Sequence, residues 1–264
     1  MTKQAAIIGA TGYTGQDLVR LIASHPELSL VSVHASDASV GTPLSVRCPS
    51  LRSCCSLVIE PTDAGAIGAK SDVVFLATPH KLSAELAPSL LDAGLTVIDI
   101  SGGFRFKDAS VYEKWYGFKH PSAGLLQEAV YGLPELFRSD LPGARLIGVG
   151  GCYPTASSIP LAPLVSAGAV KTGTRPIINA ISGVSGAGRE PKEETIFSDV
   201  TLRPYGVTGH RHLPEIEQAV GIDCVFTPHV APFDRGIVAT THAELANGWD
   251  TARVRAALEE AYAD

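Results

Sequence analysis

The chain has 264 residues, of which 45% are hydrophobic and 18% are charged, and its formal net charge is −6. A chain of this length buries about three quarters of its surface and lies near the size at which one core splits into two, so we expect two domains. No apolar run approaches the ~20 residues that span a bilayer, and no secretory signal pattern is visible, so we expect a soluble, cytoplasmic protein. The negative charge, without a local basic stripe, argues against a nucleic-acid surface.

The first residues predict the opening of a dinucleotide-binding domain. An apolar strand, AAII, leads through Gly9, Gly12 and Gly15 into a segment with leucines at helical spacing. In dinucleotide sites such glycines permit a tight turn and the approach of a pyrophosphate to amides at the helix start. The spacing is GxxGxxG rather than GxGxxG, so the match to the usual fingerprint is imperfect.

The end of the second predicted strand leaves the choice of cofactor open. LSLVSV is followed by HASDASVG, where an acid would bind the ribose hydroxyls of NAD and a small or basic residue would leave room for a 2′-phosphate. His34 and Ser36 suit a phosphate, and Asp37 argues against one. These residues alone do not decide between NAD and NADP.

Strands continue to alternate with helices as far as residue 150. SDVVFLA, LTVIDIS and RLIGVG predict strands, and a helix pattern from Lys81 to Ala93, closed by Gly94, lies between the first two. This alternation predicts an α/β fold with a Rossmann-type, doubly wound parallel sheet. We expect this nucleotide-binding domain over residues 1–150 and a second, α+β domain over residues 151–264.

A candidate nucleophile follows the expected boundary. Cys152 stands in GVGGCYPTASS, between a glycine-rich turn and SSIPLAPLV, which predicts a helix. Gly150 and Gly151 let the backbone approach a ligand, and amides at a helix start attract an anion. A buried structural thiol is the alternative, and the local context favours a nucleophile over it. The five cysteines form neither a disulfide framework nor a CxxC metal pattern, so we expect reduced thiols and no metal.

A nucleophilic thiol needs a second group. An unperturbed cysteine has a pKa near 8.5, so half ionisation at pH 7 costs about 2 kcal/mol, of which a helix start supplies about 0.3–1 kcal/mol. Histidine is the obvious contributor, and the densest histidine cluster is GHRHLPEIEQ, where His210 and His212 flank Arg211. Because LPEIEQAV predicts a helix with Pro214 in its first turn, a solvated basic turn before that helix explains the cluster equally well.

Six motifs resemble those of one known family. In chain order they are GATGYTG, FLATPH, YGLPEL, GCYPTA, ISGVSGAGR and GHRHLPEIEQ. They resemble the N-acetyl-γ-glutamyl-phosphate reductases, the arginine-biosynthesis family of the semialdehyde dehydrogenase group, along essentially the whole chain. The resemblance implies an oxidoreductase that uses NADPH to reduce the acyl phosphate to the semialdehyde, with release of phosphate, through a cysteine thioester. It also implies a homo-oligomer, dimer or tetramer, formed through the second domain. A thiolate suits this reaction because phosphate is a good leaving group and a thioester accepts hydride.

The resemblance assigns the catalytic and cofactor residues. Cys152 carries the acyl group, and the first histidine of the HRH element, His210, is the acid/base that helps to form the thiolate and later protonates the hemithioacetal oxygen; His212 is the less favoured candidate. Amides near Cys152 are expected to bind the carbonyl oxygen. The residues expected at the cofactor are Gly9, Thr11, Gly12, Tyr13, Thr14, Gly15, Ser36, Pro79, Ser182 and Gly183.

The substrate's phosphate and carboxylate require cations, and arginine's planar fork suits both groups. Arg105 in SGGFRF follows a predicted strand end, at the edge where open α/β sheets bind ligands, and we expect it to bind the phosphate. Arg189 and Arg211 are the candidates for the other end of the substrate. For each of the three, an ordinary surface position is an equally good interpretation.

The sequence also departs from the family pattern. Gly150 stands where the family usually has proline, which loosens the turn that aims the thiol, and Gly103 replaces the acid of the family's DFR. WDTARVRAALEEAYAD predicts an amphipathic helix, after which the family continues through closing strands and an asparagine-bearing segment. Without them we expect an exposed sheet edge and poor or no reduction of the acyl phosphate by this chain.

Other functions remain open from the sequence. An aspartate-semialdehyde dehydrogenase shares the nucleotide domain, the thiol and the reaction type, although HRHxPEIEQ favours the glutamyl substrate. A non-catalytic module for dinucleotide binding or subunit pairing is a second alternative. A thiol hydrolase would use Cys152 and His210 but would leave GATGYTG without a role.

Overall fold

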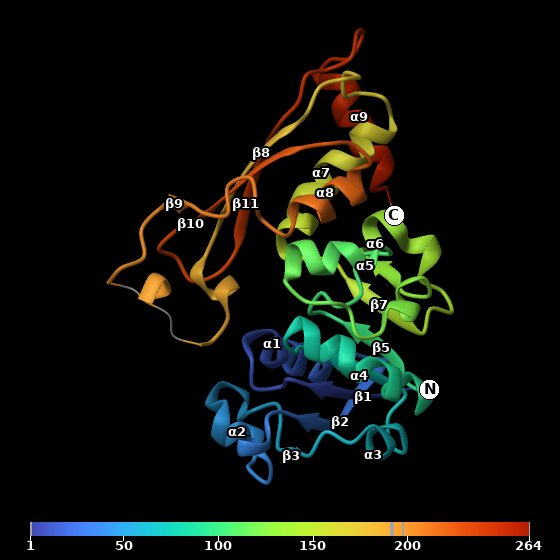
Figure 1. Cartoon of the computed structure of the whole chain (residues 1–264), viewed down its shortest axis with the longest axis vertical. Coiled ribbons are helices and arrows are strands. Elements are labelled where there is room, and N and C mark those ends of the chain that lie inside the picture. The colour runs from blue at the N-terminus through green and yellow to red at the C-terminus, as the bar shows by residue number, and fades with distance from the viewer. Residues whose placement is uncertain (1, 191–192, 197, 264) are drawn as a thin grey trace. The chain divides into compact units, whose positions relative to one another are not determined.

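A computed structural model describes residues 2–190, 193–196 and 198–263. The chain forms two compact units, each with its own sheet (Figure 1). The first comprises Met1–Gly132 and Ser139–Val149, and the second comprises Leu133–Arg138 and Gly150–Asp264. The short excursion of residues 133–138 into the second unit has no signal in the sequence.

A seven-stranded sheet, parallel throughout, forms the centre of the first unit. Its strand order is β3-β2-β1-β4-β5-β7-β6, so the direction of winding reverses at β1. The carboxyl ends of β1 and β4 therefore flank the switch point at which such sheets bind ligands. The strands are β1 (Lys3–Ile8), β2 (Leu28–His34), β3 (Ile59–Glu60), β4 (Val73–Leu76), β5 (Thr96–Asp99), β6 (Val130–Gly132) and β7 (Leu146–Val149).

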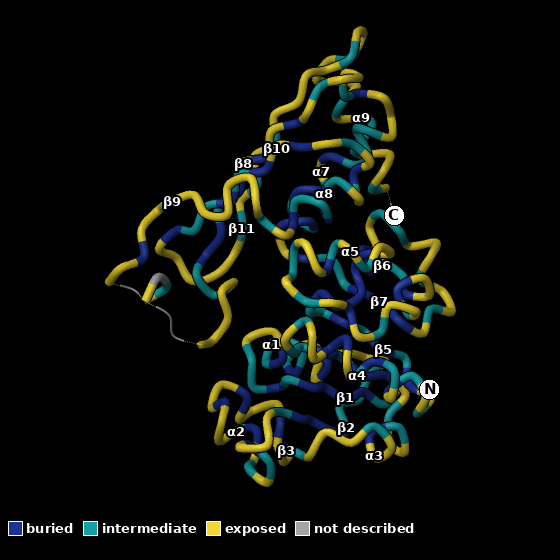
Figure 2. Tube along the Cα trace, in the orientation of Figure 1, coloured by how far each residue is buried: buried dark blue, intermediate teal, exposed yellow. Residues whose placement is uncertain are grey.

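The central strand β1 shows why this sequence forms a sheet covered on both faces. Its side chains alternate between two cores, since Ala5 and Ile7 belong to one and Ala6 and Ile8 to the other. A strand buried on both faces needs an unbroken apolar run, which AAII supplies. Figure 2 draws the centre of this sheet as buried. The predicted doubly wound α/β fold is confirmed.

Helices cover both faces of this sheet. Val19 and Ile22 of α1 join one core, whereas Ala84, Ala87 and Leu90 of α4 join the other. The helix predicted from Lys81 to Ala93 extends from His80 to Asp92. The helices of the first unit are α1 (Tyr13–Ala23), α2 (Leu44–Arg47), α3 (Ala64–Gly68), α4 (His80–Asp92) and α5 (Ala109–Val111).

The second unit contains a mixed four-stranded sheet, β11-β8-β10-β9. β8 and β10 are parallel, and the two outer strands pair antiparallel to them. The strands are β8 (Ile177–Ser182), β9 (Arg203–Pro204), β10 (Val225–Val230) and β11 (Ile237–His242). The helices are α6 (Pro134–Phe137), α7 (Cys152–Ser166), α8 (Leu213–Val220) and α9 (Thr251–Ala261).

The longest helix, α7, organises the second unit. It packs against β11, α8 and α9, and in Figure 1 α7 and α8 lie side by side. It begins at Cys152, five residues before the predicted segment SSIPLAPLV, because Pro154 is accommodated in the first turn, where backbone N–H groups have no partner within the helix. A helix with the length and apolarity to cross a bilayer does not occur in the described ranges.

Candidate active site

The glycine-rich loop between β1 and α1 requires its glycines. Gly9 has φ +92°, and a Cβ atom there would lie 2.2 Å from the carbonyl oxygen of Ala77 after β4. A Cβ atom on Gly15 would lie 2.2 Å from the carbonyl oxygen of Gly9. Gly12 is the N-cap of α1 and carries no side chain, so the amides of the first turn remain available to an anion. The loop has the geometry of a pyrophosphate cradle at the switch point of the sheet.

Four further cofactor residues predicted in the first unit lie at the starts of α1 and α4. Thr11 precedes the N-cap, and Tyr13 and Thr14 open α1. Pro79 is the N-cap of α4, directly after β4. Both helices therefore start at the carboxyl edge of the parallel sheet.

His34 and Ser36, the two residues after β2 that suit a phosphate, differ in their exposure. The His34 ring is buried, with Nδ1 2.9 Å from the carbonyl oxygen of Pro61 and Nε2 3.1 Å from the Ser32 hydroxyl. Burial lowers the pKa of His34, which disfavours a charged phosphate ligand there. Ser36 is exposed as the N-cap of the short 3₁₀ turn Asp37–Ser39, so it keeps its predicted access to a ligand.

A cation that the sequence analysis missed lies beside this turn. Arg47, exposed at the end of α2, donates from Nη2 to the Ser39 hydroxyl at 3.0 Å. The next residue, Cys48, has its sulfur 3.9 Å from the carbonyl oxygen of Thr11 in the glycine-rich loop. α2 therefore holds Arg47 beside the turn after β2, the region in which dinucleotide folds bind the ribose. The signal was available, because Arg47 is the only Lys or Arg between residues 35 and 51.

Arg105 has a bracing role that its sequence position did not reveal. The side chain is 6% exposed and donates from Nε to the carbonyl oxygen of Val149 at 2.8 Å and from Nη2 to that of Ile100 at 3.1 Å. Its guanidinium thus joins the segments after β5 and at the end of β7. Phosphate binding by Arg105 stays a prediction.

The substitution at Gly103 has a local explanation. The buried Asp99 carboxylate accepts hydrogen bonds from the Gly103 amide at 2.7 Å and from the Ser83 hydroxyl at 2.5 Å. A Cβ atom at Gly103 would lie 3.2 Å from that carboxylate, so an acidic side chain would face a like charge. Asp99 already supplies the acid that organises this turn.

In the second unit, Cys152 is exposed at the first position of α7. The preceding residue, Gly151, is the buried N-cap, and its N–H donates to Oε1 of Glu215 at 2.7 Å. Glu215 is fully buried and belongs to the first turn of α8. Its carboxylate fixes the backbone that carries the thiol, although the two residues are 64 positions apart. The sequence analysis treated this acid only as part of a helix start.

His210 lies in a ring of aromatic side chains. Its ring centroid is 5.6 Å from that of Tyr153, 5.4 Å from that of Tyr205 and 5.5 Å from that of Phe226. Burial, with a smaller contribution from Arg211, lowers the pKa of His210 to about 4. The imidazole is therefore neutral at pH 7.

Two tyrosines connect the histidine with the thiol's end of α7. Tyr153 directly follows Cys152, and its hydroxyl accepts from the Tyr205 hydroxyl at 3.0 Å and donates to the carbonyl oxygen of His229 at 3.1 Å. Burial raises the pKa of Tyr205, and the charge of Cys152 adds to this rise. Tyr205 thus interacts with both candidate catalytic residues. It was also missed, because a tyrosine in a loop carries no sequence signal of its own.

The other predicted residues of the second unit divide between this cluster and the surface. Ser182, the buried last residue of β8, hydrogen-bonds the Tyr153 hydroxyl. At Gly183 a Cβ atom would lie 2.5 Å from the carbonyl oxygen of Asp234, so this position requires glycine. Arg211 is exposed beside His210, and Arg189 is exposed in the loop after β8.

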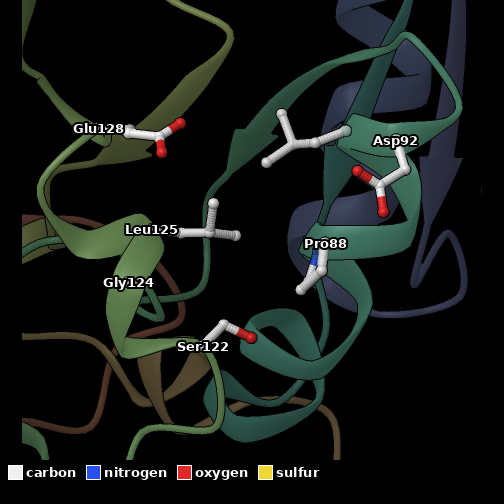
Figure 3. Close-up of a pocket in the computed structure, with 7 residues that line it drawn as sticks. Pro88, Asp92, Ser122, Gly124, Leu125 and Glu128 are labelled. Atoms are coloured by element: carbon white, nitrogen blue, oxygen red, sulfur yellow. The ribbon is translucent and has the colours of Figure 1, made fainter.

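A surface depression of about 460 Å³ lies elsewhere in the first unit (Figure 3). α4 begins at the carboxyl edge of the sheet, so the residues that line the depression from its C-terminal half lie toward the opposite edge. The depression is therefore separate from the nucleotide loop. Its lining residues are Pro88, Leu91, Asp92, Ser122, Gly124, Leu125 and Glu128.

The first unit holds a glycine-rich loop on a parallel sheet, and the second has a thiol at a helix start, followed by Tyr153, whose ring packs against the half-buried His210. These features define a two-domain dehydrogenase of the semialdehyde dehydrogenase group. Family models agree, since the semialdehyde dehydrogenase NAD-binding domain matches residues 4–144 and the semialdehyde dehydrogenase dimerisation domain matches residues 152–264. The chain belongs to the family of N-acetyl-γ-glutamyl-phosphate reductases, as its resemblance predicted.

Curated relatives carry this assignment. The chain is 46% identical over 261 residues to the N-acetyl-gamma-glutamyl-phosphate reductase of Tolumonas auensis, covering 97% of this chain and 78% of the relative. It is 44% identical over 260 residues to that of Escherichia coli K12, with the same coverage of 97% and 78%.

Solved structures agree at the level of the fold. Aspartate semialdehyde dehydrogenase II of Vibrio cholerae, in complex with ASA, superposes with a TM-score of 0.74 at 17% identity, covering 99% of this chain and 80% of that one. A probable aspartate-semialdehyde dehydrogenase of Pseudomonas aeruginosa superposes with a TM-score of 0.70 at 21% identity, covering 98% and 79%.

Proposed function

We propose that the reaction of this protein is the NADPH-dependent reduction of N-acetyl-γ-glutamyl phosphate to N-acetylglutamate semialdehyde, with release of phosphate, in arginine biosynthesis. The observation that carries the proposal is Cys152 at the start of α7, next in the chain to Tyr153, whose ring packs against that of His210. The names of the curated relatives supply the substrate. The alternative, an aspartyl phosphate, rests on structures below 25% identity, which support the fold alone.

In this proposal Cys152 is the nucleophile. The amides of the first turn of α7 favour negative charge at the sulfur and on the oxygen of a bound acyl group. The thiolate attacks the acyl carbon, phosphate leaves with the electron pair of the broken C–O bond, and a thioester remains on Cys152. His210 is its catalytic partner. Arg105, Arg189 and Arg211 stay the candidates for the anionic groups of the substrate.

A nicotinamide dinucleotide fits the first unit. The lack of a side chain at Gly12, and the contacts that a Cβ atom would make at Gly9 and Gly15, suit a pyrophosphate held by backbone amides. The bound reduced dinucleotide would supply the hydride that reduces the thioester. Thr11, Tyr13, Thr14 and Pro79 would complete this site, and Ser182 and Gly183 stay the candidates beside the nicotinamide. Ser36 and Arg47 would hold the 2′-phosphate, which favours NADP over NAD.

The test follows the acyl group as well as turnover. The protein is mixed with the acyl phosphate without dinucleotide, and intact mass is measured for an adduct of the N-acetylglutamyl group. We expect one adduct in the wild type and in Cys54→Ser, an exposed-thiol control, and none in Cys152→Ser. NADPH oxidation with glutamyl and aspartyl phosphates then identifies the substrate. An adduct that survives in Cys152→Ser, or preference for the aspartyl phosphate, would reject the proposal.

The finer points of assembly and location belong to the same proposal. The dimerisation-domain match supports a homo-oligomer, and we propose a dimer or tetramer in the cytoplasm, acting on a small molecule without a nucleic-acid or membrane partner. Analytical ultracentrifugation at micromolar concentration tests the assembly. A monomer throughout would reject this part.

A further inference from the structure

The loop that follows β5, residues 101–106, carries Arg105, and buried side chains hold its backbone. The first half of the loop is held by Asp99, the fully buried last residue of β5. Its carboxylate accepts hydrogen bonds from the amides of Ser101 at 3.0 Å, Gly102 at 3.3 Å and Gly103 at 2.7 Å. These bonds fix the path of the chain as it leaves the sheet.

Tyr112 holds the second half of this loop. Its hydroxyl oxygen accepts the N–H of Arg105 at 2.8 Å and the N–H of Phe106 at 3.1 Å, so two consecutive amides converge on one atom. The side chain is fully buried, and its ring packs against those of Phe118 and His120, with centroids 5.8 Å and 4.7 Å away. Because the ring cannot move without displacing this cluster, its hydroxyl is a fixed point to which the backbone of Arg105 is tied.

His120 holds the same loop on its carbonyl side. The backbone N–H of Ser122 donates to Nδ1 of His120 at 3.1 Å, so the proton of the neutral ring is on Nε2, which donates to the carbonyl oxygen of Gly103 at 2.7 Å. Burial lowers the pKa of His120, which favours this neutral form. The segment that supplies both side chains begins with the π-helical turn Tyr112–Tyr116, a rare geometry that is frequent at functional sites.

The guanidinium of Arg105 is fixed at the other end of the side chain, by its hydrogen bonds to the carbonyl oxygens of Val149 and Ile100. A Cβ atom at Gly102 would lie 3.3 Å from its Cζ atom, so the group also packs on the loop that carries it. Only 6% of the residue is exposed. A small displacement of its backbone would therefore redirect or cover the part of the fork that a ligand can reach.

We propose that Tyr112 is a positioning residue for the phosphate of the substrate, and that it acts through Arg105. Its hydroxyl fixes the backbone from which the guanidinium of Arg105 binds the phosphate, whereas Tyr112 itself is buried and does not contact the substrate. The inference rests on the proposed function, in which Arg105 is a candidate for this group, and deepens it. A planar fork binds a phosphate through two parallel hydrogen bonds, so its orientation decides whether both can form.

Tyr112→Phe keeps the ring and removes only the acceptor of the two amides. The effect is measured in the reverse reaction, in which the semialdehyde, NADP and inorganic phosphate give the acyl phosphate, NADPH and a proton. We expect Tyr112→Phe to lower kcat/KM for phosphate about 10- to 100-fold, through KM, and to leave kcat at saturating phosphate within about twofold. Tyr116→Phe removes a hydroxyl from a ring 5.5 Å away in the same cluster, and as the control it should leave kcat/KM unchanged.

A double-mutant cycle separates positioning from a general effect on the fold. In an Arg105→Ala background, Tyr112→Phe should change kcat/KM for phosphate less than about twofold, because the guanidinium through which it acts is gone. An equal loss in both backgrounds would overturn the inference. A Tyr112→Phe protein that does not fold would overturn it as well, since the hydroxyl would then be a determinant of folding.

A readout without turnover follows the Nε–H proton of Arg105 by ¹⁵N NMR. Because this proton is bonded to the carbonyl oxygen of Val149, its exchange with solvent should be slow in the wild type and in Tyr116→Phe, and at least about tenfold faster in Tyr112→Phe. Equal exchange in all three proteins would refute the inference even without activity. Absence of the acyl adduct in the wild type would instead count against the proposed function, so the two failures are distinguishable.

Discussion

The buried carboxylate of Glu215 should control the backbone that carries Cys152, and its removal should lower both stability and thiol reactivity. It is fully buried, and it accepts the N–H of the buried Gly151 at 2.7 Å. Glu215→Leu keeps the bulk but leaves that N–H unsatisfied, which costs about 1–3 kcal/mol. Glu215→Gln retains an oxygen acceptor and loses only the charge assistance, so we expect a cost of about 1 kcal/mol.

Urea unfolding by linear extrapolation measures this effect on stability, and iodoacetamide alkylation of Cys152 at pH 8 measures it at the thiol. Glu259→Leu, on the exposed surface of α9, is the matched control and should change stability by less than about 0.5 kcal/mol. We expect both the free energy of unfolding and the alkylation rate of Cys152 to decrease in the order wild type, Glu215→Gln, Glu215→Leu. If Glu215→Leu matches Glu259→Leu in stability and alkylates at the wild-type rate, the hydrogen bond does not position the turn.

Three further predictions concern the nucleotide loop, the 2′-phosphate and acid stability. Gly15→Ala should abolish NADP binding, because its Cβ would lie 2.2 Å from a loop carbonyl oxygen, whereas Gly124→Ala, with no neighbouring atom within 4 Å, should bind normally in calorimetry. Arg47→Ala should weaken NADP binding about 10- to 100-fold and leave NAD binding unchanged, with the exposed Arg52→Ala as control; equal loss for both dinucleotides would contradict it. Because the pKa of His210 is lowered from 6.5 to about 4, the unfolded state takes up a proton first, and the free energy of unfolding should decrease as pH falls through this range. His210→Gln should make that decrease shallower in urea titrations at pH 7 and pH 5.

The sequence predicted the first unit well because its signals are local. Apolar runs such as AAII are buried on both faces of the sheet, and the φ of +92° at Gly9 requires the residue type found there. The start of α7 was placed too late, because the apolar pattern begins at Ser157 whereas the helix begins at Cys152. Because Pro154 stands in the first turn, that turn shows no apolar periodicity from which the helix start could be predicted.

The candidate site was predicted less completely, because its geometry depends on contacts between distant residues. The bond from Gly151 to Glu215 joins positions 64 apart, and no local pattern distinguishes that acid from a solvated one. The buried Arg105 side chain likewise donates a hydrogen bond to the carbonyl oxygen of Val149, 44 residues away. Residue types therefore suggested the candidate nucleophile and the candidate histidine, and the fold supplied the residues that hold them.

The histidine and the thiol of the second unit are held at the starts of two neighbouring helices. Cys152 opens α7, and His212 is the N-cap of α8 and donates its backbone N–H to His210. The Glu215 carboxylate joins these two helix starts, and the Tyr153 hydroxyl links α7 to the β10 backbone through the carbonyl oxygen of His229. Helix starts provide unpaired amides that favour an anion, which is the charge that a thiolate and an acyl oxyanion both carry.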